Sequence, residues 1–575
     1  MSEPQQGIFG IDLGTTYSVV AYIDETGRPA VTRNSNGDDT TPSVVFFESE
    51  SNAVVGKVAK ESAGVYPDQV VALIKREMGN KDYTRSFFGK EYNPSGISAL
   101  ILGALAKDAA EATQRTVREV VITVPAYFGL LEKDATKKAG EIAGLDVIGI
   151  VPEPVAAAMH YGVTGNADGT TFLVYDLGGG TFDISLITMT ETSIEVLAVG
   201  GDHMLGGADW DKKLFDHILE QTIEQTGDDS IEDDEGVLQE LRQLAENTKQ
   251  ALSKAESKTV IHRLAGAAVK IVVTRKQFEE MTAELLDETI RITRRTLEDA
   301  EARYPGVTSR ISELLLVGGS SWMPAVTDRL KEEFSWSPKL ADPDLAVAKG
   351  AALYAAGQTV RYVEAGGPGG EPGRQPEDNG GRTASLPAGP VTPEAVRAIA
   401  DQTGLDEKQV EELAKRTVVN VLPKAVGILL VDTSVPNWDE SDASVEAASY
   451  IKHLVAAQTQ LPYRAETFTA GTGTANQETI EIQIWEQSGA VAAPELPANH
   501  RVDNAGLIEG LGAYSLPAGS AVDITVEVDA EGTVSLVAVE PRSGKELKMS
   551  VKISIMPEEK VAEAKANFSG LVLTT

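Results

Sequence analysis

Two stretches of the chain, far apart in sequence, share one pattern of apolar strand, tight turn and second apolar strand. Residues 7–24, GIFGIDLGTTYSVVAYID, and residues 172–189, FLVYDLGGGTFDISLITM, each run through Asp-Leu-Gly into a small-residue turn that contains threonine. Glycine and threonine at a turn flanked by β-branched and aromatic residues predict a β-hairpin. One such hairpin is a weak signal, but two of the same pattern predict a duplicated, two-lobed domain.

Neighbouring segments have the alternation expected of an α/β domain. Residues 119–128 read as a strand that ends at Pro125, and residues 130–144 read as the helix that follows. Residues 313–334 combine an apolar strand, a Gly-Gly turn and an amphipathic helix, whose N-terminus would face whatever lies beyond the strand. Residues 237–255 place apolar residues at helical spacing and predict a further helix.

The pattern changes after this region. Residues 364–390 are rich in glycine and proline and poor in apolar residues, which predicts a disordered linker. Residues 392–417 then predict two short helices around a turn at Thr403-Gly404.

The last part of the chain has a period of two. Residues 478–487, 521–540 and 545–556 alternate apolar and polar positions, and Glu531-Gly532 marks a hairpin turn. Alternating strands with little helix predict a compact β-sandwich. The final residues contain no long amphipathic helix.

Composition narrows the range of partners. The chain has 575 residues, enough for several domains, because single cores usually stop growing near ~250–300 residues. Its net charge of -35 argues against nucleic acid or an anionic membrane as partner. It has no cysteine, which excludes disulfides, thiolate metal sites and a cysteine nucleophile. The first residues lack the pattern of a signal peptide and no apolar run is long enough for a membrane helix, so a cytoplasmic location is expected.

Carboxylates stand beside both turns. Asp176 precedes the glycines of the second turn, Asp183 follows them, and Asp12 matches Asp176 in the first hairpin. Backbone N–H groups of such a turn can bind phosphate, but carboxylates repel phosphate unless a cation stands between them. Mg²⁺ is typically shared between one or two carboxylates and substrate phosphates. We therefore predict that Asp12 and Asp176 hold hydrated Mg²⁺; two tight hairpins with solvated aspartates are the alternative.

Five motifs carry a resemblance to a known family: GIDLGTTYS (10–18), VVITVPAYF (120–128), EPVAAAMHYG (153–162), VYDLGGGTFDIS (174–185) and LLLVGGSSWMP (314–324). From about residue 7 to residue 556 the chain resembles the DnaK-type chaperones, the seventy-kilodalton heat-shock protein family. The resemblance implies an α/β actin-like two-lobed ATPase domain followed by an all-β substrate-binding sandwich. It implies a stress-response chaperone that hydrolyses ATP and binds extended apolar segments of unfolded proteins.

The resemblance also implies roles for residues around the hairpins. Lys75 matches a lysine that contacts the γ-phosphate and orients water, and Glu153 matches a glutamate that links metal, water and a conformational switch at Pro125. Thr181 and Asp183 match positions near the attacking water and K⁺. The implied cofactors are ATP or ADP, Mg²⁺ and K⁺. The positions that match the phosphate-binding turns are Gly14, Thr15, Thr16, Tyr17, Gly178, Gly179 and Gly180.

The implied adenosine site lies further along the chain. Glu246, Lys249 and Ser253 share one helix face, where they could clamp a ribose and a purine; a solvated polar face is the alternative. Trp322 stands where the family usually has arginine, and both side chains can stack on a purine. The other residues matched to this site are Gly318, Gly319, Ser320, Ser321 and Asp344.

In the β region, five apolar residues match the lining of the family's peptide cleft: Ile428, Val431, Phe468, Ile480 and Ile482. Ile480 and Ile482 share one face of a strand, which suits a groove for extended backbone. Packing in the interior of the sandwich is the alternative for each of them.

The chain departs from the family in several places. A helical lid is absent, and the short leucine-rich linker is replaced by the glycine- and proline-rich stretch with its two predicted helices. Residues 435–450 look like an acidic insertion. Gly149 replaces the basic residue used for J-domain docking, and Ala208 replaces an acidic residue.

The implied organisation is a nucleotide-binding domain over residues 1–362, a linker over 363–422, a β-sandwich over 423–557 and a short tail over 558–575. The implied partners are unfolded polypeptides, a J-domain co-chaperone and a nucleotide exchange factor. Two other functions remain open. One is a nucleotide-dependent binding or scaffold protein with little or no turnover, and the other is an actin-fold sugar kinase, for which the sandwich has no evident purpose.

Overall fold

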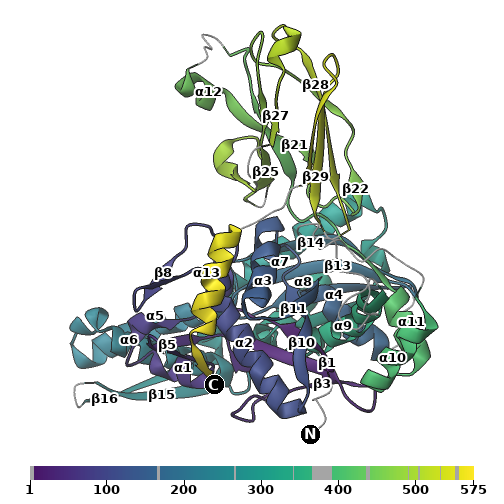
Figure 1. Cartoon of the computed structure of the whole chain (residues 1–575). Coiled ribbons are helices and arrows are strands. Elements are labelled where there is room, and N and C mark those ends of the chain that lie inside the picture. The colour runs from purple at the N-terminus through teal and green to yellow at the C-terminus, as the bar shows by residue number, and fades with distance from the viewer. Residues whose placement is uncertain are drawn as a thin grey trace.

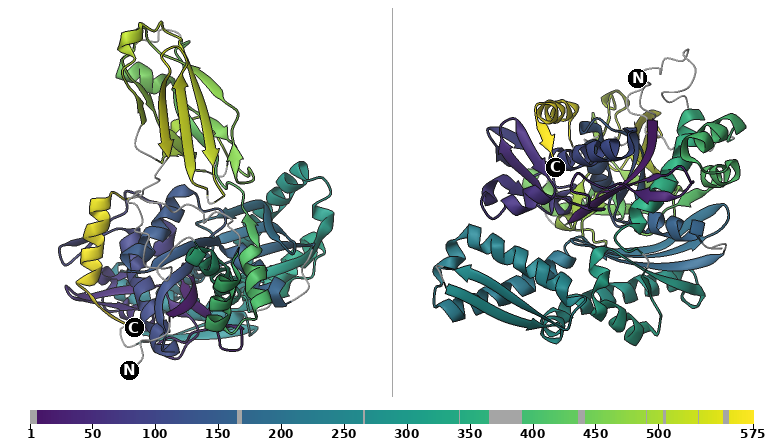
Figure 2. Two further views of the ribbon diagram at one scale, coloured as in Figure 1. Left: turned by 45° about the vertical axis from the view of Figure 1, so that its right-hand side comes forward. Right: turned by 90° about the horizontal axis from the view of Figure 1, so that it is seen from below.

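The structure is a computed structural model that describes residues 6–164, 169–264, 267–340, 342–364, 391–435, 441–489, 491–502, 506–530, 532–550 and 556–575. It consists of an α/β body and a C-terminal β module that stands on that body (Figure 1). Seen from below, the body divides into two lobes, one built mainly from the first part of the chain and one from the middle (Figure 2).

The first lobe is built on a mixed sheet in the order β11-β10-β1-β2-β3, with β4 paired to β2. Its bounds are β1 (Gln6–Asp12), β2 (Tyr17–Ile23), β3 (Pro29–Val31), β4 (Thr41–Pro42), β10 (Thr116–Val124) and β11 (Asp146–Pro152). Helices α2 (Pro94–Thr113) and α3 (Leu130–Ile142) cover one face and share its core. A smaller part adds α1 (Lys57–Ser62), β5 (Val45–Ser49), β6 (Asn52–Val55), β7 (Val70–Val71), β8 (Arg85–Phe87) and β9 (Lys90–Tyr92).

The second lobe repeats this plan with a sheet in the order β18-β17-β12-β13-β14-β19. Its strands are β12 (Thr170–Leu177), β13 (Phe182–Met189), β14 (Ser193–Asp202), β17 (Ile311–Val317), β18 (Lys339–Leu340) and β19 (Thr417–Val419). The hairpin of β15 (Ser257–Leu264) and β16 (Ala267–Thr274) extends from it. Its helices are α5 (Gly207–Thr226), α6 (Glu235–Leu252), α7 (Arg275–Arg303) and α8 (Pro324–Phe334).

The two predicted hairpins are confirmed, and they hold equivalent places in the two sheets. Strands β1 and β2 pair antiparallel with Asp12 opposite Val19, and β12 and β13 pair with Asp176 opposite Asp183. In each lobe a parallel strand, β10 or β17, lies on the other side of the first hairpin strand. The duplication inferred from the sequence is therefore a duplication of structure.

Helices α4 (Glu153–Thr164) and α9 (Ala346–Glu364) pack closely where the two lobes join. Their small side chains lie in a core that also includes residues from both sheets. The approach is closest at Gly350, where an added Cβ would lie 1.7 Å from the carbonyl oxygen of Ala156. Glycine is required here because any larger side chain would push the two helices apart.

Residues 393–415 form the two predicted helices, α10 (Pro393–Thr403) and α11 (Glu407–Lys415), which pack on α9. The Arg361 guanidinium donates to the carbonyl oxygens of Ala414 (2.9 Å) and Arg416 (3.3 Å). Strand β19 follows directly and pairs in parallel with the edge of β14. The predicted disordered linker, residues 364–390, falls outside the described residues except for its first residue, which ends α9.

The described part of the β module has two larger antiparallel sheets and the two-stranded sheet β24-β27, and all three contribute to one apolar core. In β28 (Ala521–Val528) and β29 (Val534–Glu540) buried residues alternate with more exposed ones, as the period of two predicts. One of the larger sheets has the order β21-β20-β25-β26, and in the other β22 and β23 both pair with β28, followed by β29 and β30. The remaining bounds are β20 (Val426–Val431), α12 (Asp442–Ala448), β21 (Ser449–Val455), β22 (Tyr463–Arg464), β23 (Phe468–Gly471), β24 (Ile480–Ile482), β25 (Ile484–Gln487), β26 (Asn499–Arg501), β27 (Gly506–Ile508) and β30 (Lys545–Ser550).

The module is seated on both lobes. The fully buried Glu486 accepts a hydrogen bond from the backbone N–H of Leu130 at the start of α3 (3.0 Å). Lys424 of the module forms a largely buried ion pair with Glu132, which also lies on α3. On the second lobe, the Gln458 amide bonds both the N–H (2.9 Å) and the carbonyl oxygen (2.7 Å) of Val199.

The last residues return to the first lobe. The sequence predicts only a short tail over residues 558–575, and the structure gives this segment a helix, α13 (Glu558–Ser569), and a strand, β31 (Val572–Thr574). Helix α13 runs down from the module along the body (Figure 1), and β31 joins the sheet edge at β6. Within the described residues, none of the helices has the length and apolar character needed to cross a membrane.

We expect Gly350→Ala to lower the free energy of unfolding of the α/β body by about 1–3 kcal/mol, because the new methyl group overpacks the α4–α9 contact. The matched control is Gly64→Ala, since an added Cβ there has no atom within 4 Å. Urea unfolding followed by circular dichroism measures both variants. Equal midpoints for the two variants would contradict the close packing of α4 and α9.

Candidate functional site

The two hairpin turns face each other directly across the gap between the lobes. A Cβ added at Gly179 would lie 1.9 Å from Thr16 Oγ1, and one added at Gly180 would lie 2.2 Å from Thr15 Cγ2. Gly14 is equally restricted, because its Cβ would lie 1.9 Å from the carbonyl oxygen of Tyr17. The glycines therefore allow two backbone turns, one from each lobe, to approach within contact distance.

A buried cluster of charged side chains lies next to these turns. Lys75, in the short 3-10 helix Ile74–Glu77, donates to Glu153 Oε1 over 2.6 Å, and both side chains are less than a tenth exposed. Asp12, Asp176 and Asp183 interact electrostatically with this pair. One lysine thus stands among four carboxylates.

The pKa values follow from that imbalance. Burial and the neighbouring Glu153 raise the pKa of Asp12 to about 7, although Lys75 and a hydrogen bond from Thr123 (2.8 Å) oppose the shift. Burial, and then the charge of Glu153, also hold the pKa values of Asp176 and Asp183 well above their usual range. A bound cation would remove this repulsion and restore the ionised carboxylates.

The residues present fit a metal ion and a phosphate group. Thr16 Oγ1, Asp183 Oδ2 and Asp211 Oδ1 are buried polar atoms without a hydrogen-bond partner among the described residues. Backbone N–H groups of glycine turns suit phosphate oxygens. Here the N–H groups of Gly14 and Gly178 already donate, to Ser18 Oγ (3.2 Å) and to the carbonyl oxygen of Thr181 (3.0 Å), so the other N–H groups of the turns would serve. In the described parts of the chain no group of three or more acidic or histidine side chains is arranged to hold a metal. A cation here would therefore have two carboxylates, Asp12 and Asp176, and would take its other ligands from water and phosphate, as Mg²⁺ commonly does.

The turns open into a cleft of about 1270 Å³, lined by residues of both lobes. Ligand sites are usually about 300–1,000 Å³, so a nucleotide-sized molecule fits within this volume.

Polar bridges between the lobes line the cleft. Lys60 pairs with Glu246 over 2.6 Å, and Tyr17 donates its hydroxyl to the same carboxylate (3.0 Å). Arg76 donates to the carbonyl oxygen of Gly180 (2.8 Å) and to Asp209 (2.6 Å). The lobes are thus held closed by groups from both sides.

The sequence does not predict three of these groups: Lys60, Arg76 and Asp209. Lys60 lies in no motif that would distinguish it from a surface charge. Arg76 directly follows Lys75 and Asp209 directly follows Ala208, and these neighbours were the signals available.

Of the residues predicted to bind adenosine, Glu246 lines the cleft, Lys249 and Ser320 both lie beside Gly207, and Ser253 lines a smaller pocket. Lys249 donates to Asp211 (2.7 Å) and to the carbonyl oxygen of Gly207 (2.9 Å), and Ser253 caps the end of α6. Glu246 is held by Lys60, so the polar face of this helix is ordered by contacts with neighbouring elements.

Trp322 is the last residue of the 3-10 helix Gly319–Trp322. Its indole N–H donates to Asp344 (2.9 Å), while half of the side chain stays exposed. The preceding turn is closely packed: Gly318 has φ +79, and its Cβ would lie 2.4 Å from Asp176 Oδ1. This turn therefore connects the indole to the carboxylate cluster.

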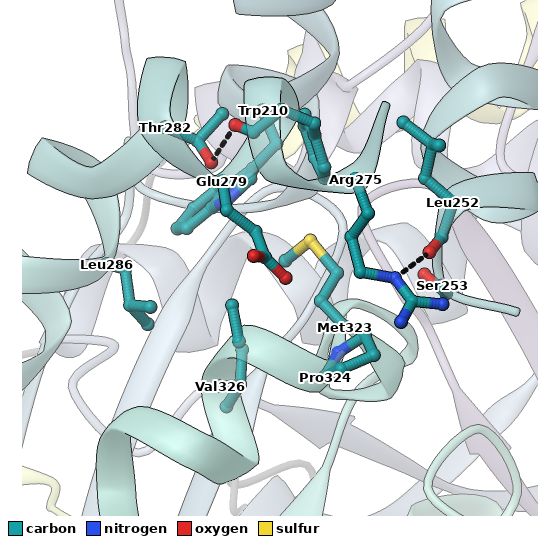
Figure 3. Close-up of a pocket in the computed structure, with 12 residues that line it drawn as sticks. Trp210, Leu252, Ser253, Arg275, Glu279, Thr282, Leu286, Met323, Pro324 and Val326 are labelled. Carbon is teal, nitrogen blue, oxygen red and sulfur yellow. Dashed lines mark hydrogen bonds between the residues drawn. The ribbon is translucent and has the colours of Figure 1, made fainter. Parts of the chain in front are cut away.

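A smaller pocket lies between Ser253 and Met323, and both residues line it (Figure 3). Met323 directly follows Trp322. Arg275 crosses one side and donates to the carbonyl oxygen of Leu252 (2.8 Å), and Glu279 points inward, where burial raises its pKa. The pocket brings α6, α7 and the Trp322 turn together, although they are far apart in sequence.

The residues predicted to line a peptide cleft divide into two groups. Ile428 and Ile482 are buried in the core of the β module (1% and 4% exposed), which is the alternative reading of these positions. Phe468 and Ile480 are half-buried and pack against that core, and Val431 is half-buried at the end of β20. A peptide surface on this module stays a prediction.

The predicted switch residue, Pro125, lies next to a contact with the cluster. The N–H of Ala126 donates to Asp183 Oδ1 (3.2 Å), and the N–H of Phe128 bonds the carbonyl oxygen of Pro125 (3.1 Å). The Pro125 segment therefore connects the second hairpin to the start of α3.

Comparison with known proteins gives one family and a set of curated relatives. A family model described as Hsp70 protein matches residues 8–360. Proteins named chaperone protein DnaK from two strains of Halobacterium salinarum are each 43% identical over 289 residues, which is 49% of this chain and 45% of the relative. The chain therefore spans less than half the length of these relatives.

In the metal-free protein, we expect Asp12 to make folding pH-dependent. Its pKa is about 7 when folded against an ordinary 3.8, so the folded state binds the proton more tightly. This contribution to stability is complete below pH 3.8 and is lost as the pH rises to about 7. Asp12→Asn should flatten the fall in unfolding free energy between pH 4 and about 7, measured by urea titration in EDTA. The exposed Asp38 on the cleft rim supplies the control, Asp38→Asn; a slope that is unchanged in Asp12→Asn would contradict the assignment.

Proposed function

Because this chain belongs to the Hsp70 family, we propose that it is an ATP-dependent molecular chaperone. It hydrolyses ATP in the cleft between its lobes and binds extended apolar segments of unfolded polypeptides on its β module. The observation that carries the proposal is the pair of opposed glycine turns beside a buried cluster of carboxylates and one lysine.

The nucleotide lies across both lobes. The turns Gly14–Tyr17 and Gly178–Gly180 offer backbone N–H groups to the phosphates. The polar face of α6 and the half-exposed indole of Trp322 hold the ribose and purine, since an aromatic ring can replace the arginine that usually stacks there.

Asp12 and Asp176 would hold Mg²⁺, and Thr181 with Asp183 would border a K⁺ ion. The metal supplies positive charge that neutralises the phosphates as negative charge shifts during phosphoryl transfer. The raised pKa values of Asp12 and Asp176 support the assignment. They show that the buried carboxylates repel one another and that Lys75 alone does not balance their negative charge.

The protein's own groups position the reacting water. Glu153 fixes the Lys75 ammonium by a 2.6 Å hydrogen bond, so the ammonium is preorganised to stabilise charge on the terminal phosphate. Asp183 uses one oxygen to accept from Ala126, and its other oxygen has no partner among the described residues. That second oxygen is available to orient a water molecule or to accept its proton.

A short path connects this chemistry to the β module. Asp183 bonds Ala126, and four residues later the N–H of Leu130 bonds the buried Glu486 of the module. A shift of Asp183 when the nucleotide changes would move this segment and the seat of the module together. This physical continuity supports coupling between the two parts.

The partners we propose are unfolded polypeptides, with a J-domain co-chaperone and a nucleotide exchange factor. For the J-domain, the chain lacks the family's basic residue at Gly149, which lies on β11 against Tyr354 of α9. A co-chaperone of this type would have to use other contacts.

Asp183→Asn should reduce ATP turnover by about 10²-fold or more, because it removes the group that orients water or accepts its proton. Phosphate release at saturating ATP and Mg²⁺ measures the effect, with Asp38→Asn as the control on the cleft rim. If Asp183→Asn and the control turn over equally, the catalytic assignment is wrong.

An apolar peptide should stimulate ATP turnover, and Ile480→Asp should abolish that stimulation while basal turnover remains. The matched control is Leu507→Asp, on the strand paired with β24, where the side chain is already 46% exposed. Circular dichroism would establish that both variants are folded. Absence of stimulation in the unmodified protein would favour a nucleotide-dependent scaffold over a chaperone.

A further inference from the structure

Residues 556–575, which we call the clamp segment, give the β module a second connection to the body, on the first lobe. The first connection is β19, which lies on the sheet of the second lobe. The module therefore lies between two attachments, one to each lobe, in addition to its contacts with α3 (Figures 1 and 2).

The helical part of the clamp segment makes few apolar contacts. Val561 and Met556 are buried against Ala99 of α2 and Ile142 of α3. Much of α13 otherwise faces solvent. A 12-residue helix is marginal by itself in water, so α13 depends on its seat on the lobe to stay folded.

The surface of α2 has a hollow that fits the clamp segment. The hollow is at Gly103, where an added Cβ would lie 2.7 Å from Phe568 Cζ and 3.0 Å from Leu573 Cδ1. The three atoms nearest to that position all belong to the clamp segment. Glycine inside a helix is less favourable than alanine, and here it provides space for the phenyl ring.

The strand part extends a sheet. Residues 572–574 pair in parallel with residues 52–54 of β6, and the N–H of Val572 bonds the carbonyl oxygen of Ser51 (2.8 Å). Addition of a strand to an exposed edge is a common mode of peptide recognition, because backbone hydrogen bonds give affinity and side-chain pockets give specificity. The Gly103 hollow is such a pocket.

Polar contacts fix the end of the strand. Lys107 donates to the carbonyl oxygen of Leu573 (3.0 Å). The Thr575 hydroxyl lies within hydrogen-bond distance of the Ser35 hydroxyl (2.8 Å) and of the buried Asp108 carboxylate (3.1 Å). The strand is therefore held in one register by groups on both sides of it.

We infer that the edge of β6 and the Gly103 hollow form a receptor for the clamp segment of the same chain, and that its occupation keeps the β module seated on the body. The occupant is the chain itself, because the segment lies directly on this surface and residues 558–575 follow the module in sequence. Since the seat is small, the clamp can release; the module would then be attached only through β19 and its own interface. The inference does not depend on nucleotide hydrolysis.

The absence of cysteine makes a direct test possible. One pair of spin labels, at Arg118→Cys on the first lobe and Lys548→Cys on β30, reports on the module. A second pair, at Arg118→Cys and Lys565→Cys on α13, reports on the clamp segment. All three side chains are largely exposed, so labelling should not disturb the core.

Gly103→Leu and Phe568→Ser are the test variants, and Val572→Thr is the control, because Val572 is 64% exposed and its backbone bonds remain. Pulsed EPR on the full chain without nucleotide gives the distances. We expect one narrow distribution for each pair in the unmodified protein and the control. In both test variants we expect the two distributions to broaden and shift to longer distances.

Three outcomes would overturn the inference. The clamp pair could stay unchanged in Gly103→Leu and Phe568→Ser, which would mean that the hollow is not the receptor. The clamp pair could lengthen while the module pair does not, which would mean that the clamp does not seat the module. Light scattering of the unmodified protein could give a dimer joined by exchanged clamp segments, which would make a second copy the occupant.

Discussion

The arrangement of the body depends on one electrostatic constraint: four carboxylates and a single lysine are buried where two backbone turns meet. The Lys75–Glu153 pair neutralises one of these carboxylates and leaves Asp12, Asp176 and Asp183 with raised pKa values. Burial of unpaired charge is costly, so such a site is stable only when the charges are protonated or balanced by a cation. Under the proposed function, closing the lobes and binding a metal with its phosphate would therefore be two parts of the same equilibrium.

Much of the body was predictable from local sequence. The two hairpins repeat one pattern, and the strand-turn-helix at residues 313–334 and the helix before Ser253 follow standard periodicities. The two hairpins could be assigned to one site from the sequence because each lobe places its turn at the same edge of its sheet. As a result the two turns meet, with Gly179 against Thr16 and Gly180 against Thr15.

Other features depend on contacts between distant parts of the chain, which local patterns do not encode. Nothing in the local sequence distinguishes Lys60 from other helix lysines; its role follows only from the ion pair with Glu246, which the fold brings opposite it. Strand β31 is three residues long and pairs with a strand some five hundred residues earlier, so no periodicity predicts it. Ile428 in β20 and Ile482 in β24 are apolar strand residues of the kind that line a groove, and only their burial shows that they lie in the interior. Gly103 lies inside the long helix α2, and only its contacts with Phe568 and Leu573 in the structure explain why a glycine is there.

The docked pair of α10 and α11 has a consequence for the chain that precedes it. Residue 364 ends a helix packed in the body, and residues 393–415 are fixed on that same helix, with Gly357 so close to α11 that a Cβ would lie 2.7 Å from the Leu413 carbonyl oxygen. Because both ends of the intervening stretch are anchored, its length does not set where β19 emerges. The register between the second lobe and the module is therefore set by the packing of α10 and α11 on α9.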